Sequence, residues 1–252
     1  MPSSVQEKIR RQAAAWRREN HDRPVIGFTG GYFATDALRM LNRSEGYLRP
    51  EDINVERVLE DCDREAAAWE GSMGDLFWTA RPLLGFRWLP AVLGAPVFVG
   101  GDSIWAEAFL KDYAQLDRFV FSEDNEWVQC LWALSDAMVK NAAGRYPVAT
   151  DEFMAPLTTL AEIRGNTELA LDIYDHPDDL LRGLMILTEL WGALTTAHYK
   201  RLPAWYGGYC AGQRHIWAPG RIGEFNEDPA FMFSLRHHRR FVLPSHQKLI
   251  RF

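Results

Sequence analysis

Hydrophobic residues recur at helical spacing in several stretches of the 252-residue chain. The clearest stripe, with intervals of three and four residues, consists of Val55, Leu59, Cys62, Ala66 and Trp69. Residues 127–138 and 180–194 carry similar stripes of leucine, tryptophan and methionine, and residues 4–20 carry a shorter one. The pattern therefore predicts four amphipathic helices, the last of them long.

Short apolar segments separate these stripes. Residues 24–28, 75–80, 146–150 and 221–225 each read as a buried strand, and residues 96–101 read as part of a β-ribbon excursion. Strands that alternate with helices favour βα units and a parallel sheet. The predicted fold class is therefore α/β.

Composition and charge narrow the range of functions. The net charge is −6, so no basic field is available for nucleic acid. The longest apolar stretch is broken by Pro90, Gly94 and Pro96 and is too short to span a membrane. The amino terminus is polar, without a signal peptide, and the three cysteines are far apart, which fits a reducing cytoplasm. We expect a cytoplasmic protein that binds a small molecule and contacts neither nucleic acid nor membrane.

Two stretches carry a family resemblance. Residues 145–191 read RYPVATDEFMAPLTTLAEIRGNTELALDIYDHPDDLLRGLMILTELW, with an Ala155-Pro156 turn, a threonine-led helix and an Ile-Tyr-Asp-His-Pro helix start. Residues 225–230 read FNEDPA, and residues 240–244 read RFVLP. In order and spacing, these stretches resemble the middle of the uroporphyrinogen decarboxylase superfamily.

The resemblance implies a (β/α)8 TIM barrel, a fold of typically about 250 residues. Residues 1–252 are then a single, incomplete domain: an amino-terminal helix, about the first four βα units and the β-ribbon excursion. We therefore expect a divergent member, truncated at its carboxyl end. No cofactor is evident, and the resemblance implies zinc or a corrinoid only if a missing carboxyl-terminal half supplies the ligands.

Function in such barrels lies at the carboxyl ends of the strands and in the loops that follow. After the first predicted strand, true decarboxylases carry arginines that hold substrate carboxylates, whereas this chain has glycines and aromatics. An aspartate that follows the second strand in the family is absent, and Glu162 stands where the family has a tyrosine. The resulting candidates for ligand binding are Gly30, Gly31, Tyr32, Phe33, Trp78, Arg81 and Glu162. Since three family positions differ, we expect no uroporphyrinogen decarboxylation.

Acidic residues end the third and fourth predicted strands. Glu152, Glu227 and Asp228 are the candidate catalytic residues, because carboxylates from neighbouring strand ends can act as an acid–base pair or bind a cation. Alternatively, they cap helices, which fits Asp228 before its proline. Trp205 and Tyr206 belong to an aromatic loop and either contact the ligand or pack within that loop.

Three functions stay open at this point. The first is an enzyme of the superfamily that acts on an unknown small or medium organic ligand. The second is an enzyme that resembles the corrinoid-linked methyltransferases of the same superfamily. The third is a non-catalytic fragment or one half of a split barrel. Half a barrel leaves open strand edges, so we also expect self-association or a complementing chain.

Overall fold

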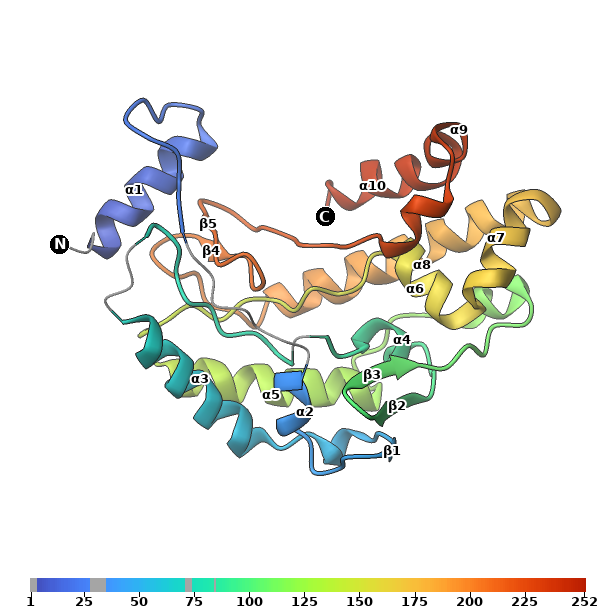
Figure 1. The fold of residues 1–252 in the computed structure, drawn as a ribbon, viewed down its shortest axis with the longest axis horizontal. Helices are drawn as coiled ribbons and strands as arrows, with labels where there is room; N and C mark the ends of the chain where they lie inside the picture. Colours follow the sequence, from blue (N-terminus) through green and yellow to red (C-terminus); the bar gives the residue numbers. More distant parts are fainter. Residues whose placement is uncertain (1–3, 28–34, 71–73, 84) are drawn as a thin grey trace.

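A computed structural model describes residues 4–27, 35–70, 74–83 and 85–252. Its α-helices are α1 (Val5–Trp16), α2 (Thr35–Arg39), α3 (Val55–Trp69), α4 (Trp88–Val92), α5 (Glu126–Ala142), α6 (Pro156–Arg164), α7 (Asn166–Asp175), α8 (Pro177–Tyr199), α9 (Leu235–His237) and α10 (Leu243–Leu249). Shorter helical turns are η1 (Pro50–Asp52), η2 (Tyr113–Arg118), η3 (Asp228–Met232) and the π-helical η4 (His238–Val242). Helices thus dominate the described residues (Figure 1).

The four predicted amphipathic helices are confirmed as α1, α3, α5 and α8. Local capping explains where they begin. The Ser4 hydroxyl accepts from the Glu7 amide while the Glu7 carboxylate accepts from the Ser4 amide, a capping box that starts α1. Asn125 caps α5 in a similar way, and Pro177 takes the first position of α8, where a missing N–H costs nothing.

The strands form two small antiparallel sheets. β1 (Gly46–Tyr47), β2 (Val97–Gly100) and β3 (Ser103–Ala106) lie in the order β1-β2-β3, with Phe98 opposite Trp105. β4 (Tyr209–Cys210) and β5 (Trp217–Ala218) form the other sheet. The β2–β3 hairpin confirms the predicted β-ribbon excursion.

The predicted parallel sheet of four strands is wrong for the described residues. Residues 24–27, 75–80, 146–150 and 221–225 form no strand, and a closed barrel is absent from the described part of the chain. One parallel bridge, between Ala80 and Val148, joins the second and third segments, and the Asp75 amide donates to the Ile26 carbonyl at 2.7 Å between the first and second. Pro24 and Pro147 lack the N–H that a continuous ladder needs.

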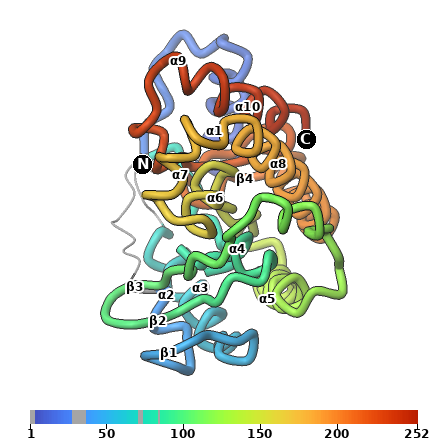
Figure 2. The backbone as a smooth tube through the Cα atoms, turned by 90° about the vertical axis from the view of Figure 1, so that its right-hand side faces the viewer, coloured from blue at the N-terminus to red at the C-terminus, as the bar shows by residue number. Residues whose placement is uncertain are grey.

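Two long helices organise the core. Figure 1 shows α5 and α8 crossing the molecule, with α3 beside α5 and with α6, α7 and α10 around α8. Leucines of α5, α6 and α8 are almost fully buried, among them Leu131, Leu134, Leu157, Leu160, Leu184 and Leu187. Figure 2 shows α9 and α10 on the same side of the molecule as α1, and β1 on the opposite side. The segments that carry the predicted site residues are thus held between helix layers.

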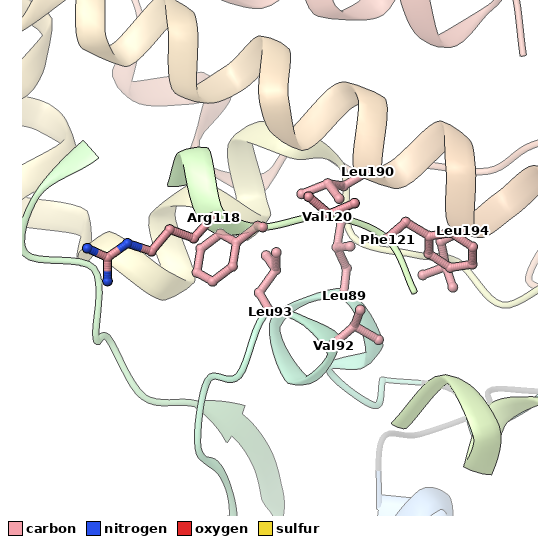
Figure 3. Close-up of a pocket in the computed structure, with 9 residues that line it drawn as sticks. Leu89, Val92, Leu93, Arg118, Val120, Phe121, Leu190 and Leu194 are labelled. Carbon is pink, nitrogen blue, oxygen red and sulfur yellow. The ribbon is translucent and has the colours of Figure 1, made fainter. Parts of the chain in front are cut away.

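Where α4 approaches α8, a small apolar pocket of about 90 Å³ is left. Leu89 of α4 and Leu93, the residue after this helix, lie across from Leu190 and Leu194 of α8, and Val120 also lines the pocket (Figure 3). None of the helices among the described residues is long and apolar enough to cross a membrane. Cys62, Cys130 and Cys210 are free cysteines.

Candidate functional site

The second segment (residues 75–80) and the third segment (residues 146–150) end side by side. The Ala80 amide donates to the Pro147 carbonyl at 3.0 Å, and the Ala149 amide donates to the Ala80 carbonyl at 2.8 Å. Parallel chains that share this register end at one edge, so Arg81 and Asp151 follow at the same place. The two groups interact there, since Arg81 lowers the pKa of Asp151.

Asp151 is a buried carboxyl group with an incomplete set of partners. It is 4% exposed, and its Oδ1 accepts from the Glu152 amide at 2.9 Å. Its Oδ2 meets no hydrogen-bond donor of good geometry among the described residues. Burial raises the pKa of Asp151 well above its usual range, although Arg81 opposes the shift. Burial therefore favours the protonated form of Asp151, which can donate a hydrogen bond.

Glu152 lies next to it and is 9% exposed. Burial and, after it, the charge of Glu224 raise the pKa of Glu152, while Arg214 and Arg81 lower it. With its amide nitrogen turned toward Glu152, Gln213 donates to the carboxylate oxygens at 2.7 and 3.3 Å. Glu224 accepts from the backbone amides of Gln213 at 2.7 Å and Arg214 at 3.0 Å, which holds residues 213–214 over the two acids.

Glu162 brings a third, half-buried carboxyl group to this region. It lies in α6, with its Oε1 2.8 Å from Arg87 Nε. Burial raises the pKa of Glu162 to about 7, while Arg87 lowers it and Asp228 raises it. A carboxyl group with this pKa can both give and take a proton near neutral pH.

Glu227 and Asp228 end the fourth segment, and they bind the start of α6. Glu227 Oε2 accepts from the Thr158 amide at 3.0 Å, and Glu227 Oε1 is 3.1 Å from His246 Nε2. The Asp228 amide donates to Thr158 Oγ1 at 2.9 Å. Glu227 thus caps α6. This helix follows the third segment, whereas Glu227 itself follows the fourth. The exposed side chain of Asp228 stays close enough to affect Glu152 and Glu162.

Several side chains around these ends form one charged group, which we call the carboxylate cluster. Its members are Asp151, Glu152, Glu162, Glu224 and Asp228, together with Arg81, Arg87 and Arg214. Burial is the largest cause of the raised pKa at Asp151, Glu152 and Glu162, and neighbouring acids add to it. Arg214 of the cluster and its neighbour Gln213 also line a cleft of about 560 Å³ beside α1, which is large enough for a small molecule.

The other sequence candidates lie elsewhere. Trp78 packs edge-to-face on Tyr146 at 4.8 Å, two residues before the bridge, at the opposite end of the segments from Asp151. Trp205 packs on Phe77 at 4.9 Å near the same end. Tyr206 is 52% exposed. Gly30, Gly31, Tyr32 and Phe33 lie outside the described residues. The structure therefore brings Arg81, Glu152, Glu162 and Asp228 together, and places Trp78, Trp205 and Tyr206 apart from them.

Sequence reasoning missed part of the cluster. Arg87 and Glu224 carry no motif, and only the folded chain places them beside Glu162 and Glu152. Glu224 precedes the predicted strand-end acids by three residues, a weak signal that acidic residues gather there. Within residues 4–27, 35–70, 74–83 and 85–252, no group of three His, Cys, Asp or Glu side chains converges on a possible metal position. Zinc or a corrinoid thus stays a prediction from the resemblance.

Comparisons with known proteins place the fold. A scan against models of protein families finds no match, and no curated protein matches the sequence. A solved structure, a methyltransferase from Methanosarcina mazei, superposes with a TM-score of 0.62 and 15% sequence identity. The two share a fold. The match covers 96% of this chain and 65% of that chain, so this chain spans just under two thirds of its neighbour's length.

Proposed function

We propose that this chain is a divergent member of the uroporphyrinogen decarboxylase superfamily that takes part in methyl transfer. The carboxylate cluster is its binding site for a small organic ligand. The fold shared with a methyltransferase over 96% of the chain supports this choice over a decarboxylase. The observation that carries the proposal is the buried, incompletely partnered Asp151 beside Glu152 at the end of the third segment.

Charge decides the class of ligand. Burial and neighbouring acids raise the pKa of Glu152 by more than Arg214 and Arg81 lower it, so these two guanidinium groups compensate its ionised form only in part. A ligand that is cationic, or that carries hydrogen-bond donors, supplies what Glu152 lacks, and an acceptor atom on the ligand can take the hydrogen bond of protonated Asp151. An anionic ligand adds to the repulsion. The ligand is therefore small and either positively charged or neutral.

Glu162 has the properties of an acid for such a reaction. In a methyl transfer, a nucleophilic acceptor forms the new bond to the methyl carbon, and the atom that loses the methyl group keeps the old bonding electron pair. Where that atom is an oxygen of a neutral ligand, a proton delivered to it favours its departure. Glu162, whose pKa burial raises to about 7, is protonated in part of the molecules at neutral pH. It serves as the proton donor in this proposal, with Arg87 positioning it.

Three probes of similar size and different charge test the ligand class: tetramethylammonium, tert-butanol and pivalate. We expect tetramethylammonium to raise the melting temperature and pivalate to leave it unchanged. A ligand at one hundred times its Kd stabilises a protein by about 2.7 kcal/mol. Glu152→Gln should weaken tetramethylammonium binding about tenfold, equal to about 1.4 kcal/mol.

The matched control for that variant is Glu56→Gln, which alters an exposed acid in the first turn of α3. It should bind tetramethylammonium as the wild type does. Equal stabilisation by all three probes, or unchanged binding in Glu152→Gln, would show that the carboxylate cluster is not the ligand site.

We propose, second, that the chain works in association with another copy or another chain. The carboxyl-terminal helices expose large apolar side chains: Phe231 is 86%, Leu235 67% and Ile250 78% exposed. Exposed apolar surface of this kind is typical of association sites when the residues gather in one patch.

Size-exclusion chromatography with light scattering tests the association. We expect particles larger than the 28.9 kDa of one chain. Replacing Phe231 with serine should shift the population toward single chains, while Val120→Ser, an exposed apolar residue at the α4–α8 pocket, serves as the control. A single 28.9 kDa species in the wild type at tens of micromolar would rule the association out.

A further inference from the structure

A second cleft among the described residues lies at the opposite end of the segments from the carboxylate cluster. It measures about 730 Å³, within the usual range for small-molecule sites. Helices α1 and α3 form its sides, and the starts of the second and third segments form its base. We call it the aromatic cleft, after the rings that line it: Trp69, Phe77, Trp78, Tyr146 and Trp205.

These rings come from separate parts of the chain and hold one another in place. Phe77 and Trp205 meet edge-to-face at 4.9 Å, and Trp78 and Tyr146 do so at 4.8 Å. The Trp205 indole donates to the Gly144 carbonyl at 3.1 Å. Rings fixed in this way present flat apolar faces without losing further conformational entropy when a ligand binds. The cleft is thus suited to a planar aromatic group.

The charged side chains of the cleft differ in whether a protein group of opposite charge lies beside them. Asp63 accepts hydrogen bonds from Arg145 at 2.8 Å, from the Tyr146 hydroxyl at 3.1 Å and from Asn141 at 3.1 Å. Its charge therefore has partners already. Glu70, also at the cleft, is exposed and solvated.

Lys8 of α1 is different, because it is half-buried in the cleft wall. Its Nζ lies 3.4 Å from the Leu76 carbonyl and 5.8 Å from the centroid of the Phe77 ring. Burial lowers the pKa of Lys8, although Asp75 opposes the shift. Within the described residues, no carboxylate lies at salt-bridge distance from this ammonium group. A ligand carboxylate can supply that missing partner.

From this arrangement we infer that the aromatic cleft binds a planar aromatic anion, with the ring between the tryptophans and the carboxylate at Lys8. The inference is independent of the proposed function, since the two sites share no lining residue and call for ligands of opposite charge. An acidic aromatic metabolite has the required chemistry.

Three naphthalene probes test the charge preference: 2-naphthoate, 2-naphthalenemethanol and 2-naphthylmethylamine. Quenching of tryptophan fluorescence reports binding, since Trp69, Trp78 and Trp205 line the cleft. We expect 2-naphthoate to bind at least tenfold more tightly than the amine, with the alcohol between them. Equal affinities, or tightest binding of the amine, would overturn the inference.

Two variants locate the site. Lys8→Met should weaken 2-naphthoate about tenfold and leave the neutral alcohol unchanged, whereas Lys111→Met, at an exposed position, should change neither. Trp78→Leu should weaken all three probes, and Trp105→Leu, in the β2–β3 hairpin, should not. If Trp78→Leu unfolds the chain, Trp78→Phe keeps an aromatic ring there. Unchanged 2-naphthoate affinity in Lys8→Met would show that Lys8 does not bind the carboxylate of the ligand and would overturn the inference.

Discussion

Replacing Asp75 with asparagine is expected to lower the free energy of unfolding by about 3 kcal/mol. The Asp75 carboxylate is fully buried and joins α1 to the first and second segments. Arg23 donates to both of its oxygens, at 2.6 and 2.9 Å, and Arg11 donates at 2.9 Å. The Ile26 amide adds a bond at 3.0 Å. Asparagine keeps the size of the side chain but removes the salt-bridge partner of Arg23 and leaves Arg11 with only the exposed Asp22.

The effect should depend on pH. Although burial raises it, hydrogen bonds from Arg23, Ile26 and Arg11 lower the pKa of Asp75 to about 2. A depressed pKa contributes stability that is complete above the unfolded value of about 4 and is lost as pH falls toward 2. The difference between wild type and Asp75→Asn should therefore be largest at neutral pH and shrink below about pH 4.

Urea unfolding followed by circular dichroism measures both quantities. Asp22→Asn is the matched control, because the side chain of Asp22 is 60% exposed and contacts Arg11 alone of the two arginines. It should change the free energy of unfolding by less than about 0.5 kcal/mol. An Asp75→Asn protein as stable as the wild type at pH 7 would show that this carboxylate does not hold α1 to the first and second segments.

The chain is expected to leave uroporphyrinogen unchanged. This substrate carries a carboxylate on every side chain, and its binding needs several fixed cations. Arg81, Arg87 and Arg214 are already shared among five carboxyl groups of the carboxylate cluster. Glu152 and Glu162 would repel the substrate further. Since enzymes accelerate reactions by about a million-fold or more, the difference between activity and none is large.

An anaerobic assay of carbon dioxide release and of coproporphyrinogen formation measures this directly. A true uroporphyrinogen decarboxylase in the same buffer is the control that shows the substrate is competent. Turnover by this chain well above the uncatalysed rate would contradict the charge argument and would favour decarboxylation of uroporphyrinogen over methyl transfer as the function.

The helices could be predicted from the sequence because their determinants are local. The stripe from Val55 to Trp69 became α3 without a change of boundary, and Pro177 began α8. The strands could not be predicted in the same way, because a parallel ladder depends on neighbours distant in the chain. Between Ala80 and Val148 the neighbour is present, and a bridge forms. Residues 221–225 find no such partner among the described residues, and they stay without a ladder.

The candidate site was predictable to a similar degree. The strand-end rule identified Glu152 and Arg81, because it depends on the order of segments along the chain. It also identified Glu227. The side chain of Glu227 binds the start of α6, and that contact depends on how the helix packs in the folded chain. Arg87 and Glu224 lie close to Glu162 and Glu152 only in the folded chain, and their spacing along the sequence does not predict these contacts. Trp78 and Trp205, the tryptophans among the predicted ligand contacts, line the aromatic cleft at the other end of the segments.

A crystal structure of the protein grown with tetramethylammonium tests most directly whether the carboxylate cluster is a ligand site. The expected result is a cation seated against the carboxylate of Glu152, with Gln213 and Arg214 around it and with Asp151 behind. The same crystals grown with pivalate should show no bound anion there. A structure in which Arg81 and Arg214 fill the site and the cation lies elsewhere, or is not bound, would contradict the proposed function.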